Sequence, residues 1–344
     1  MSDLFCCSGS NSFQDLNRRN FLKVGAAGLA AGMVSSPLLH AAPEEPSEKL
    51  VHKLYGLLSE EQRKVVCFDW NHKDEERGIL RTHVSNNWNI TEVDYNVGGE
   101  FFTKEQQEII REIFFGLYQP EWKKKIETQL EDDAEGYGKA QTIALFGKPG
   151  EEKFEFVMTG RHLTIRCDGN TTPHMAFGGP IFYGHAPKFN EDVGHPGNVF
   201  WYQAEKANSL YQMLDGKQRN LALIEKAPHE SLVDFRRNGE EIPGLPISEL
   251  TADQKTVAQE TLKFLLEPFR TSDQQEAMQC LTKQGGLDRC TLSFYQEGDL
   301  GEDKQWDNWR LEGPSFVWHY RGFPHVHVWV NISDDASVPL NAKG

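Results

Sequence analysis

The C-terminal part of the chain carries four strand-like segments that follow one another too closely for helices to connect them. Each is rich in β-branched and aromatic residues, and Gly, Asp and Pro separate them; they are Cys290–Tyr295, Trp309–Glu312, Phe316–Tyr320 and Val326–Ile332. Parallel neighbours would need crossover connections of about a dozen residues or more. The spacing therefore predicts an antiparallel arrangement and argues against a doubly wound fold.

A short motif marks four helix starts earlier in the chain. In each, Ser, Thr or Asp is followed three residues later by Gln, which is the pattern of a capping box. It predicts helices over Glu60–Val66, Lys104–Leu117, Gly216–Ile224 and Ala252–Leu266. A functional repeat is the alternative explanation, but the irregular spacing of the motif favours four helix starts, whose motif residues are structural.

The remaining elements complete an α+β pattern. Apolar periodicity predicts further helices over Trp122–Leu130, Phe200–Met213 and Asp273–Thr282, and a hairpin of Phe154–Met158 with His162–Cys167. Helices and antiparallel strands in separate blocks predict a mostly antiparallel sheet covered by helices.

Between the blocks, the segment Asp168–Asn198 is rich in Gly and Pro. Its aromatic content argues against disorder. We therefore expect a long Gly/Pro-rich ordered loop that packs over the sheet.

The N-terminus has the three parts of an export signal. Arg18-Arg19 gives a basic start, Val24–Leu39 is modestly apolar, and the small residues Ala41-Ala42 follow. Adjacent arginines are typical of the twin-arginine route, which exports folded proteins. Residues 1–41 are therefore expected to be a twin-arginine signal peptide, and residues 42–344 a single large α+β domain located in the periplasm or otherwise exported. A retained membrane anchor is the alternative, although the apolar stretch is short for a span.

Charge limits the partners of the mature chain. The net charge is −15, and it becomes −16 without residues 1–41. Such a surface repels nucleic acid and anionic lipid, so we expect no nucleic-acid partner and no stable membrane association after cleavage. The expected partners are the twin-arginine translocation machinery and a small-molecule ligand of unknown identity. The basic run Lys123–Lys125, before Glu131-Asp132-Asp133, is interpreted as a solvated helix face.

Four cysteines remain after the signal: Cys67, Cys167, Cys280 and Cys290. An even number in an exported protein permits disulfides, with three possible pairings. A protein that folds in the reducing cytoplasm cannot depend on them. No CxxC spacing indicates a thiolate zinc site, and Cys167 fits a buried strand cysteine better than a nucleophile.

The histidines give the clearest chemical signal. His325 and His327 alternate on a predicted strand, so both imidazoles lie on one face, and His162 begins another strand. Three such histidines match the ligand sets of catalytic zinc, copper or non-haem iron. We therefore predict a site for a divalent transition metal, of unknown identity, at His162, His325 and His327.

Other residues have secondary roles in this hypothesis. Glu312 or Asp168 is expected to add a carboxylate ligand or a partner behind a ligand, and Arg161 or Arg321 to orient an anionic substrate group. His319 joins only if it points to the same side. The loop histidines are weaker candidates taken singly; they are His174, His185 and His195.

These motifs together resemble a known family. Gly160-Arg161-His162-Leu163-Thr164, the run Gly179–Pro187, Glu312-Gly313-Pro314 and His325-Val326-His327-Val328-Trp329 are similar to an exported bacterial family catalogued as domain of unknown function 3500. The resemblance extends from about Leu50 to Ile332. It implies that His162, His325 and His327 form a linked set, and it brings no established activity.

We therefore expect an exported protein that binds a metal through a histidine cluster and acts as a hydrolase or an oxidoreductase, with the question of enzymatic activity open. The alternative is a metal-free periplasmic binding module, in which the aromatic Gly/Pro loop stacks on a sugar or an aromatic ligand through Phe182, Tyr183, Trp201 and Tyr202. A Ser or Cys hydrolase is disfavoured because the sequence has no GxSxG motif.

Overall fold

The computed structural model describes residues 46–151, 153–188, 194–236, 241–299, 305–338 and 341–342. Within these residues, eight α-helices and a large, mostly antiparallel sheet confirm the predicted α+β class. The expected signal peptide, residues 1–41, lies outside the described residues. No helix in the described part of the chain is long and apolar enough to span a bilayer.

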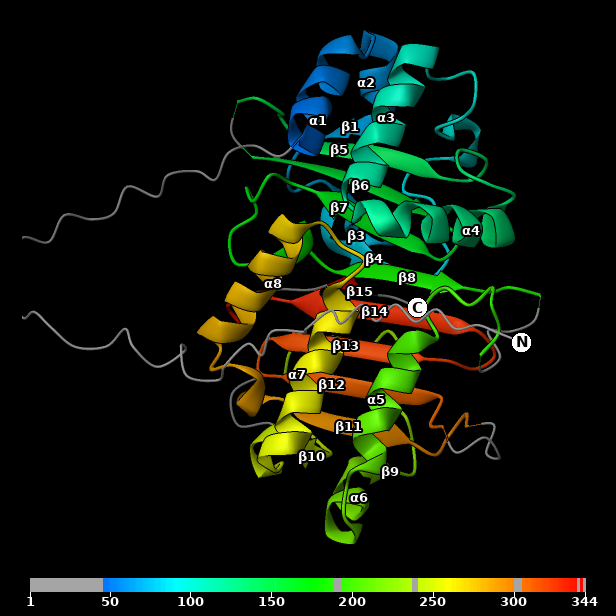
Figure 1. The fold of residues 1–344 in the computed structure, drawn as a ribbon. Helices are drawn as coiled ribbons and strands as arrows, with labels where there is room; N and C mark the ends of the chain where they lie inside the picture. The colour runs from blue at the N-terminus through cyan, green and yellow to red at the C-terminus, as the bar shows by residue number, and fades with distance from the viewer. Residues whose placement is uncertain are drawn as a thin grey trace, which may run out of the picture. The chain divides into compact units, whose positions relative to one another are not determined.

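The main sheet has 11 strands, and it contains strands from both ends of the described chain (Figure 1). In spatial order they are β1 (Cys67–Phe68), β5 (Thr142–Gly147), β6 (Phe154–Gly160), β7 (Leu163–Cys167), β8 (Ile181–His185), β14 (Val326–Ile332), β13 (Phe316–Arg321), β12 (Asn308–Gly313), β11 (Thr291–Tyr295) and β10 (Leu245–Pro246), with β9 (Leu223–Ile224) also paired to β11. The pairs β1–β5 and β9–β11 are parallel. The antiparallel pair β8–β14 lies at the centre.

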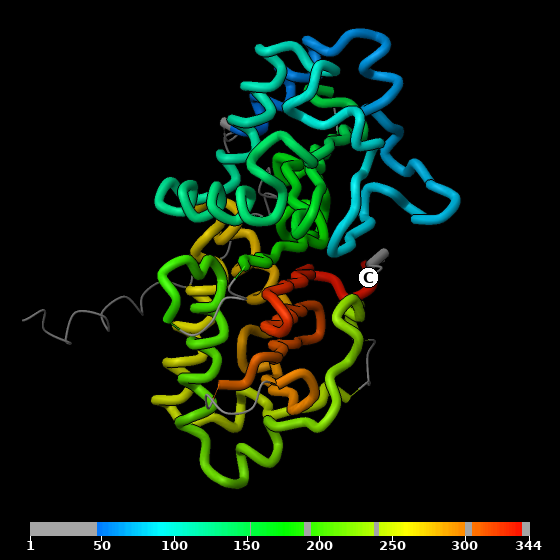
Figure 2. Tube along the Cα trace, turned by 90° about the vertical axis from the view of Figure 1, so that its right-hand side faces the viewer, coloured from blue at the N-terminus to red at the C-terminus, as the bar shows by residue number. Residues whose placement is uncertain are grey.

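The helices cover one face of this sheet (Figure 1). They are α1 (Pro46–Leu57), α2 (Glu60–Val66), α3 (Lys104–Gly116), α4 (Lys123–Ala134), α5 (Tyr202–Gln212), α6 (Gly216–Ala222), α7 (Ala252–Leu266) and α8 (Thr271–Lys283). Alternate strand residues, such as Val326, Val328 and Val330, pack with these helices in the main core. The opposite face is covered by non-helical segments (Figure 2), from which Val84 and Val233 pack against Trp329.

The four predicted helix starts are confirmed in detail. Ser59, Thr103, Asp215 and Thr251 each cap a helix, and the Gln three residues later reaches back to the cap amide in every case. The glutamines also bind one another in two pairs. The side-chain amides of Gln62 and Gln106 exchange two hydrogen bonds of 2.9 Å, and those of Gln218 and Gln254 exchange bonds of 2.9 and 2.8 Å.

The four motifs are helix starts, as predicted, and the paired capping boxes also belong to an internal structural repeat. Leaving out the 3-10 helices, the short strands at 73–74, 78–79 and 83–84, and β10, residues 46–185 run α1-α2-β1-α3-α4-β5-β6-β7-β8 and residues 202–332 run α5-α6-β9-α7-α8-β11-β12-β13-β14. The register repeats too, because Cys67 pairs with Leu145 on β5 as Leu223 pairs with Phe294 on β11. The two halves meet at β8–β14 in an approximate two-fold arrangement. The motif spacing is irregular because the connecting segments differ in length.

The predicted long loop is only partly correct. The segment Asp168–Asn198 includes β8, which lies between β7 and β14 near the middle of the sheet, and a 3-10 helix at Ala176–Gly178. Residues 189–193 lie outside the described residues. The prediction failed because Gly and Pro on both sides of Ile181-Phe182-Tyr183 hid a short buried strand.

The four cysteines in the described part of the chain are free thiols. Cys167, Cys280 and Cys290 are buried, and Cys67 is half-buried. Cys167 lies on β7, where burial raises the pKa of its thiol well above the usual value. It is therefore a structural strand cysteine, as expected.

We expect Gln106→Ala to destabilise the domain. The substitution removes the acceptor for the Thr103 amide and both hydrogen bonds to the buried Gln62 side chain. Such a loss costs about 1–3 kcal/mol, which denaturant unfolding monitored by circular dichroism will measure. Glu112→Ala, at an exposed position of the same helix, is the control. A change below about 0.5 kcal/mol for Gln106→Ala would contradict the importance of the paired glutamines.

Candidate metal centre

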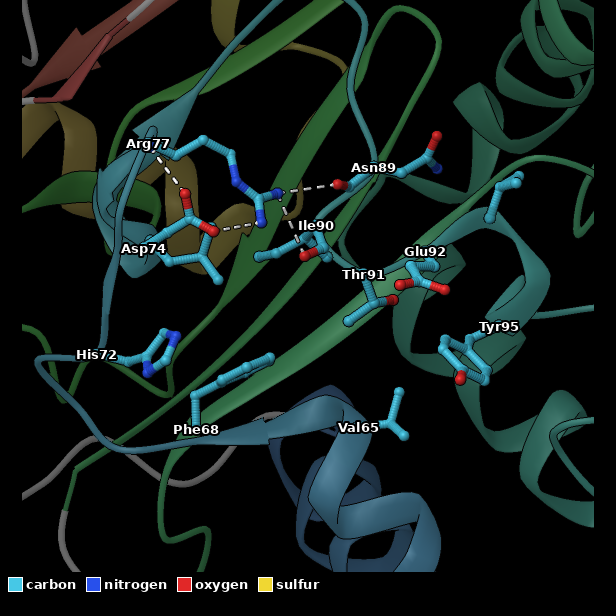
Figure 3. A pocket seen from close by; sticks show the side chains of 12 residues that line it. Val65, Phe68, His72, Asp74, Arg77, Asn89, Ile90, Thr91, Glu92 and Tyr95 are labelled. Carbon is cyan, nitrogen blue, oxygen red and sulfur yellow. Dashed lines mark hydrogen bonds and ion pairs between the residues drawn. The ribbon is translucent and has the colours of Figure 1, made fainter.

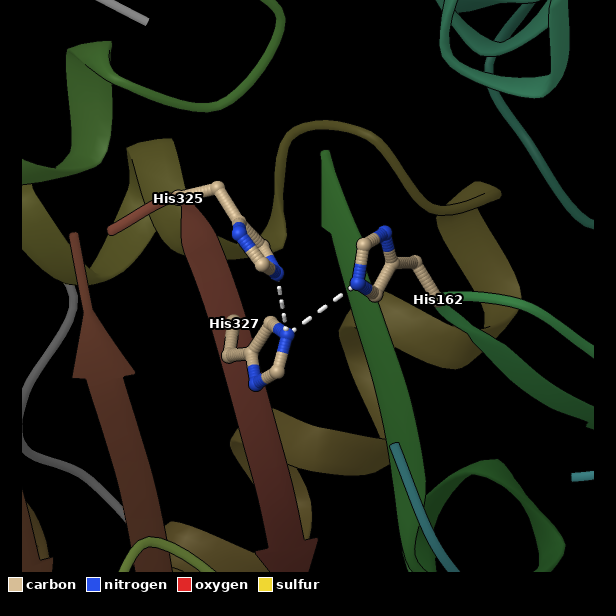
Figure 4. A group of neighbouring side chains, drawn as sticks. All are labelled: His162, His325 and His327. Carbon is tan, nitrogen blue, oxygen red and sulfur yellow. Dashed lines mark hydrogen bonds between the residues drawn. The ribbon is translucent and has the colours of Figure 1, made fainter. Parts of the chain in front are cut away.

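Three histidines from two parts of the sequence meet at one end of the central strand pair. His162 lies in the tight turn between β6 and β7, His327 lies on β14, and His325 directly precedes that strand. The Nε2 atoms of His325 and His327 are 2.9 Å apart, and those of His327 and His162 are 3.1 Å apart. All three candidate ligand atoms lie within 4.8 Å of one another. Figure 4 shows the three rings directing these nitrogens toward a common point.

Glycine at position 184 allows this approach. The β8–β14 register places Gly184 opposite His327. A Cβ at Gly184 would lie 2.3 Å from the carbonyl oxygen of Val326 and 3.4 Å from Cβ of His162. His162 itself has a left-handed backbone with φ of 52°, and its amide donates to the carbonyl of Asn86 over 3.1 Å. The turn and the glycine together bring the His162 ring against β14.

A carboxylate stands behind each of the two buried histidines. Nδ1 of His162 lies 3.0 Å from Oδ1 of Asp133 on α4, and Nδ1 of His327 lies 2.9 Å from Oε2 of Glu230. Asp133 also accepts hydrogen bonds from the side chain of Gln129 (2.8 Å) and the amide of Ala186 (2.9 Å). Carboxylates in this position keep the proton on Nδ1 and fix the ring, as they do behind metal-bound histidines.

A proton on Nδ1 of both buried rings would leave two lone pairs facing each other. With a proton on Nδ1 of both His162 and His327, neither Nε2 atom carries a hydrogen. These two atoms nevertheless lie 3.1 Å apart in a buried place. Two acceptors at this distance repel each other unless a cation lies between them, and the arrangement therefore suits a metal ion.

The electrostatics keep His325 and His327 neutral and the carboxylates Asp133 and Glu230 charged. Burial, with smaller effects of the neighbouring histidines, lowers the pKa of His325 to about 3. Burial also lowers the pKa of His327 to about 4, although Glu230 opposes the shift. For Asp133, burial raises the pKa, but His162, Gln129 and the Ala186 amide outweigh it and the net pKa is lowered. Neutral imidazole is the form that binds a metal.

A comparison with known families gives a match over most of the chain. The profile of the family described as "Protein of unknown function (DUF3500)" matches residues 40–330. The chain belongs to the DUF3500 family. No curated protein and no solved structure matches it. All three histidines lie inside the matched region of the DUF3500 domain.

The prediction that Glu312 or Asp168 supplies a carboxylate to the histidine cluster is wrong. Glu312 forms an ion pair with Arg236 (2.6 Å), and Asp168 accepts from the amides of Asn170 and Thr172. Asp133 and Glu230 were not predicted. One signal for Asp133 was present, because an acidic run at the C-terminal end of a helix opposes the helix dipole and needs a compensating partner. Glu230 lies in an irregular segment where the sequence gives no comparable signal.

The other histidines of the domain lie elsewhere. His319 is on the same face as His327, but its Nδ1 accepts from Nε of Arg310 over 3.2 Å. His185 contacts Asp132 (2.9 Å), and His174 contacts Asp334 (2.6 Å). His195 accepts from the Gly197 amide at an exposed position. The loop histidines therefore form no part of the cluster.

The aromatic residues considered for a metal-free binding surface are largely buried. Phe182, Tyr183 and Trp201 are 1%, 6% and 4% exposed. The half-buried Tyr202 donates its hydroxyl to the Phe264 carbonyl over 2.9 Å. These rings pack in the protein interior and do not present faces for stacking on a ligand.

A separate cavity of about 540 Å³ lies in the N-terminal half. Phe68, His72, Glu92 and Tyr95 are among its lining residues, and Arg77 bridges Asp74 to the backbone carbonyl of Asn89 across it (Figure 3). None of the three clustered histidines lines this cavity.

We expect Gly184→Ala to disturb the cluster, because the added methyl group has no room beside the carbonyl of Val326, the residue between His325 and His327. Overpacking of this kind costs about 1–3 kcal/mol, measurable as a lower melting temperature. Gly56→Ala is the matched control, since a Cβ there has no atom within 4 Å. Equal melting temperatures for the two variants would contradict the tight packing described here.

Proposed function

We propose that this DUF3500 protein binds one divalent transition metal ion through Nε2 of His162, His325 and His327. The observation that carries the proposal is the convergence of three Nε2 atoms within 4.8 Å, two of them on rings held by carboxylates from the other side. Zinc, copper and iron all accept imidazole ligands, and the donor set does not choose among them.

The spacing of the nitrogens supports this proposal. Zinc–imidazole bonds of about 2.0–2.1 Å place tetrahedral ligands roughly 3.3–3.4 Å apart, close to the 2.9 and 3.1 Å between adjacent Nε2 atoms. These two short distances need a small outward movement of the rings, whereas the widest separation among the three ligand atoms, 4.8 Å, must shorten for one ion to reach all of them. Asp133 and Glu230 would accept the Nδ1 protons throughout, so the rings would not have to rotate.

Three protein ligands are typical of a catalytic rather than a structural centre. When bound, the ion supplies a Lewis acid that polarises a water or substrate oxygen, or a redox partner if it is iron or copper. His162 and His327 are buried, whereas His325 is half-buried. A substrate would therefore approach from the His325 side, and we propose hydrolase or oxidoreductase chemistry there.

Elemental analysis tests the metal centre. Protein purified without an affinity tag is expected to hold about one ion per chain, because three imidazoles converge. The His325→Ala/His327→Ala double variant is expected to lose at least nine-tenths of it, since one remaining imidazole cannot retain the ion. His195→Ala, which alters an exposed histidine outside the cluster, is the control. Substoichiometric metal in the unaltered protein, or equal metal in the double variant, would refute the proposal.

We also propose that the protein reaches the periplasm by the twin-arginine route. Support comes from the Arg18-Arg19 pair, the apolar segment after it and the small residues at Ala41-Ala42. The family match begins at residue 40, next to the expected cleavage position, as it would if the preceding residues were a removable signal.

Arg18→Lys/Arg19→Lys is expected to abolish export in a bacterial host, since the translocation receptor reads the arginine pair. Fractionation with immunoblotting will show the unprocessed form in the cytoplasm. Lys23→Arg, which keeps the charge and the arginine pair, is the control and is expected to be exported normally. Periplasmic double-lysine protein would exclude the twin-arginine route.

A further inference from the structure

A row of cationic side chains lies beside the histidine cluster on the face of the sheet away from the helices. The β13–β14 register places Arg321 directly opposite His327, and the β12–β13 register places Arg310 opposite His319. On these strands, the alternate residues Trp318 and Tyr320 point into the helix-covered core. Arg321 and Arg310 are diagonal neighbours on the same face, within reach of each other's long side chains.

Arg321 shares a carboxylate with the metal centre. Its Nε lies 3.2 Å from Oε2 of Glu230, the oxygen that is also 2.9 Å from Nδ1 of His327. Its Nη2 is buried and has no hydrogen-bond partner among the described residues. A guanidinium presents its donors as a planar fork that matches an oxyanion.

Arg310 also has a buried guanidinium nitrogen without a partner among the described residues, and it lies deeper in the protein. It is only 3% exposed. Its Nε donates to His319, its Nη1 is a distant 3.6 Å from Glu312, and its Nη2 is buried without a partner in the described part of the chain. The nearer partner of Glu312 is Arg236, at 2.6 Å.

The local charges do not balance. Three guanidinium groups, Arg236, Arg310 and Arg321, share the two carboxylates Glu230 and Glu312. A partly buried site with an excess positive charge and unused donors is costly unless an anion compensates it. The chain as a whole carries −15, so this positive site contrasts with its surroundings and would select an anion locally.

We propose that Arg321 and Arg310 bind the oxyanion group, carboxylate or phosphate, of the small molecule on which the histidine centre acts. This inference rests on the proposed function and assigns its substrate class. Because residues opposite each other in an antiparallel pair have Cβ atoms about 4.5–5.5 Å apart, an oxyanion on Arg321 holds the neighbouring atoms of the ligand beside the ion at His327. The arginines orient the substrate, and the histidines hold the ion.

Calorimetric titration with two probes, inorganic phosphate and succinate, tests the proposal. At least one probe is expected to bind, and Arg321→Met is expected to weaken it about tenfold to a hundredfold, as the loss of a charge-assisted fork contact would. Arg161→Met is the matched control, because Arg161 is adjacent to His162 but exposed. The affinity of Arg310→Met for the probes is interpreted only if this variant has a native circular dichroism spectrum. The affinity of Arg321→Met alone decides whether the proposal holds. The stronger of the two probes identifies the oxyanion.

The His325→Ala/His327→Ala variant separates this inference from the proposed function. It retains both arginines, so Arg321-dependent binding of a probe is expected to persist without metal. Arg321→Met is also expected to keep its metal content within about a fifth of the unaltered protein, because the ligands remain. Absence of binding by both probes, or equal weakening by Arg321→Met and Arg161→Met, would overturn the oxyanion site even if metal is found.

Discussion

The antiparallel pairing of β8 with β14 is the contact on which the candidate site depends. It joins the two halves of the domain in one sheet and sets His327 opposite Gly184. Because Gly184 has no side chain, β8 can lie close to the Val326 carbonyl of β14, beside the His162 ring. A shift of one residue in this register would turn His327 to the helix-covered face and dismantle the cluster. The buried valines of β14 on the helix side oppose such a shift.

The internal repeat allows corresponding positions in the two halves of the domain to be compared, and they differ at the candidate site. The β6–β7 turn closes with Gly160 paired to Leu163, and the β12–β13 turn closes in the same way with Gly313 paired to Phe316. Ser315 therefore occupies the position of His162 in the second half. Its hydroxyl donates to the carbonyl of Ser333. The same position in the repeat thus carries a histidine, which is a metal-ligand type, in one half and a serine that makes a structural hydrogen bond in the other.

The sequence predicted those features whose signals are local. Capping boxes located α2 and α7 to the residue, and the alternation of residues 326–332 located β14 and its pair of histidines. The short strand β8 was missed because its neighbours are Gly and Pro, and its position in the sheet depends on β14 far along the chain. Asp133 and Glu230 were missed because a carboxylate behind a histidine is defined by tertiary contact, with no fixed spacing in sequence.

The separation of His162 from His327 along the chain, 165 positions, has a consequence for biogenesis. Contacts of such long range form late in folding, since the cost of closing the intervening chain must be met first. β14 is also among the last elements synthesised. A nascent chain that has completed only its first half carries a single histidine of the cluster and cannot hold an ion there. An ion at the proposed centre could therefore be held only after the synthesis of both halves, and it would mark chains that have finished folding.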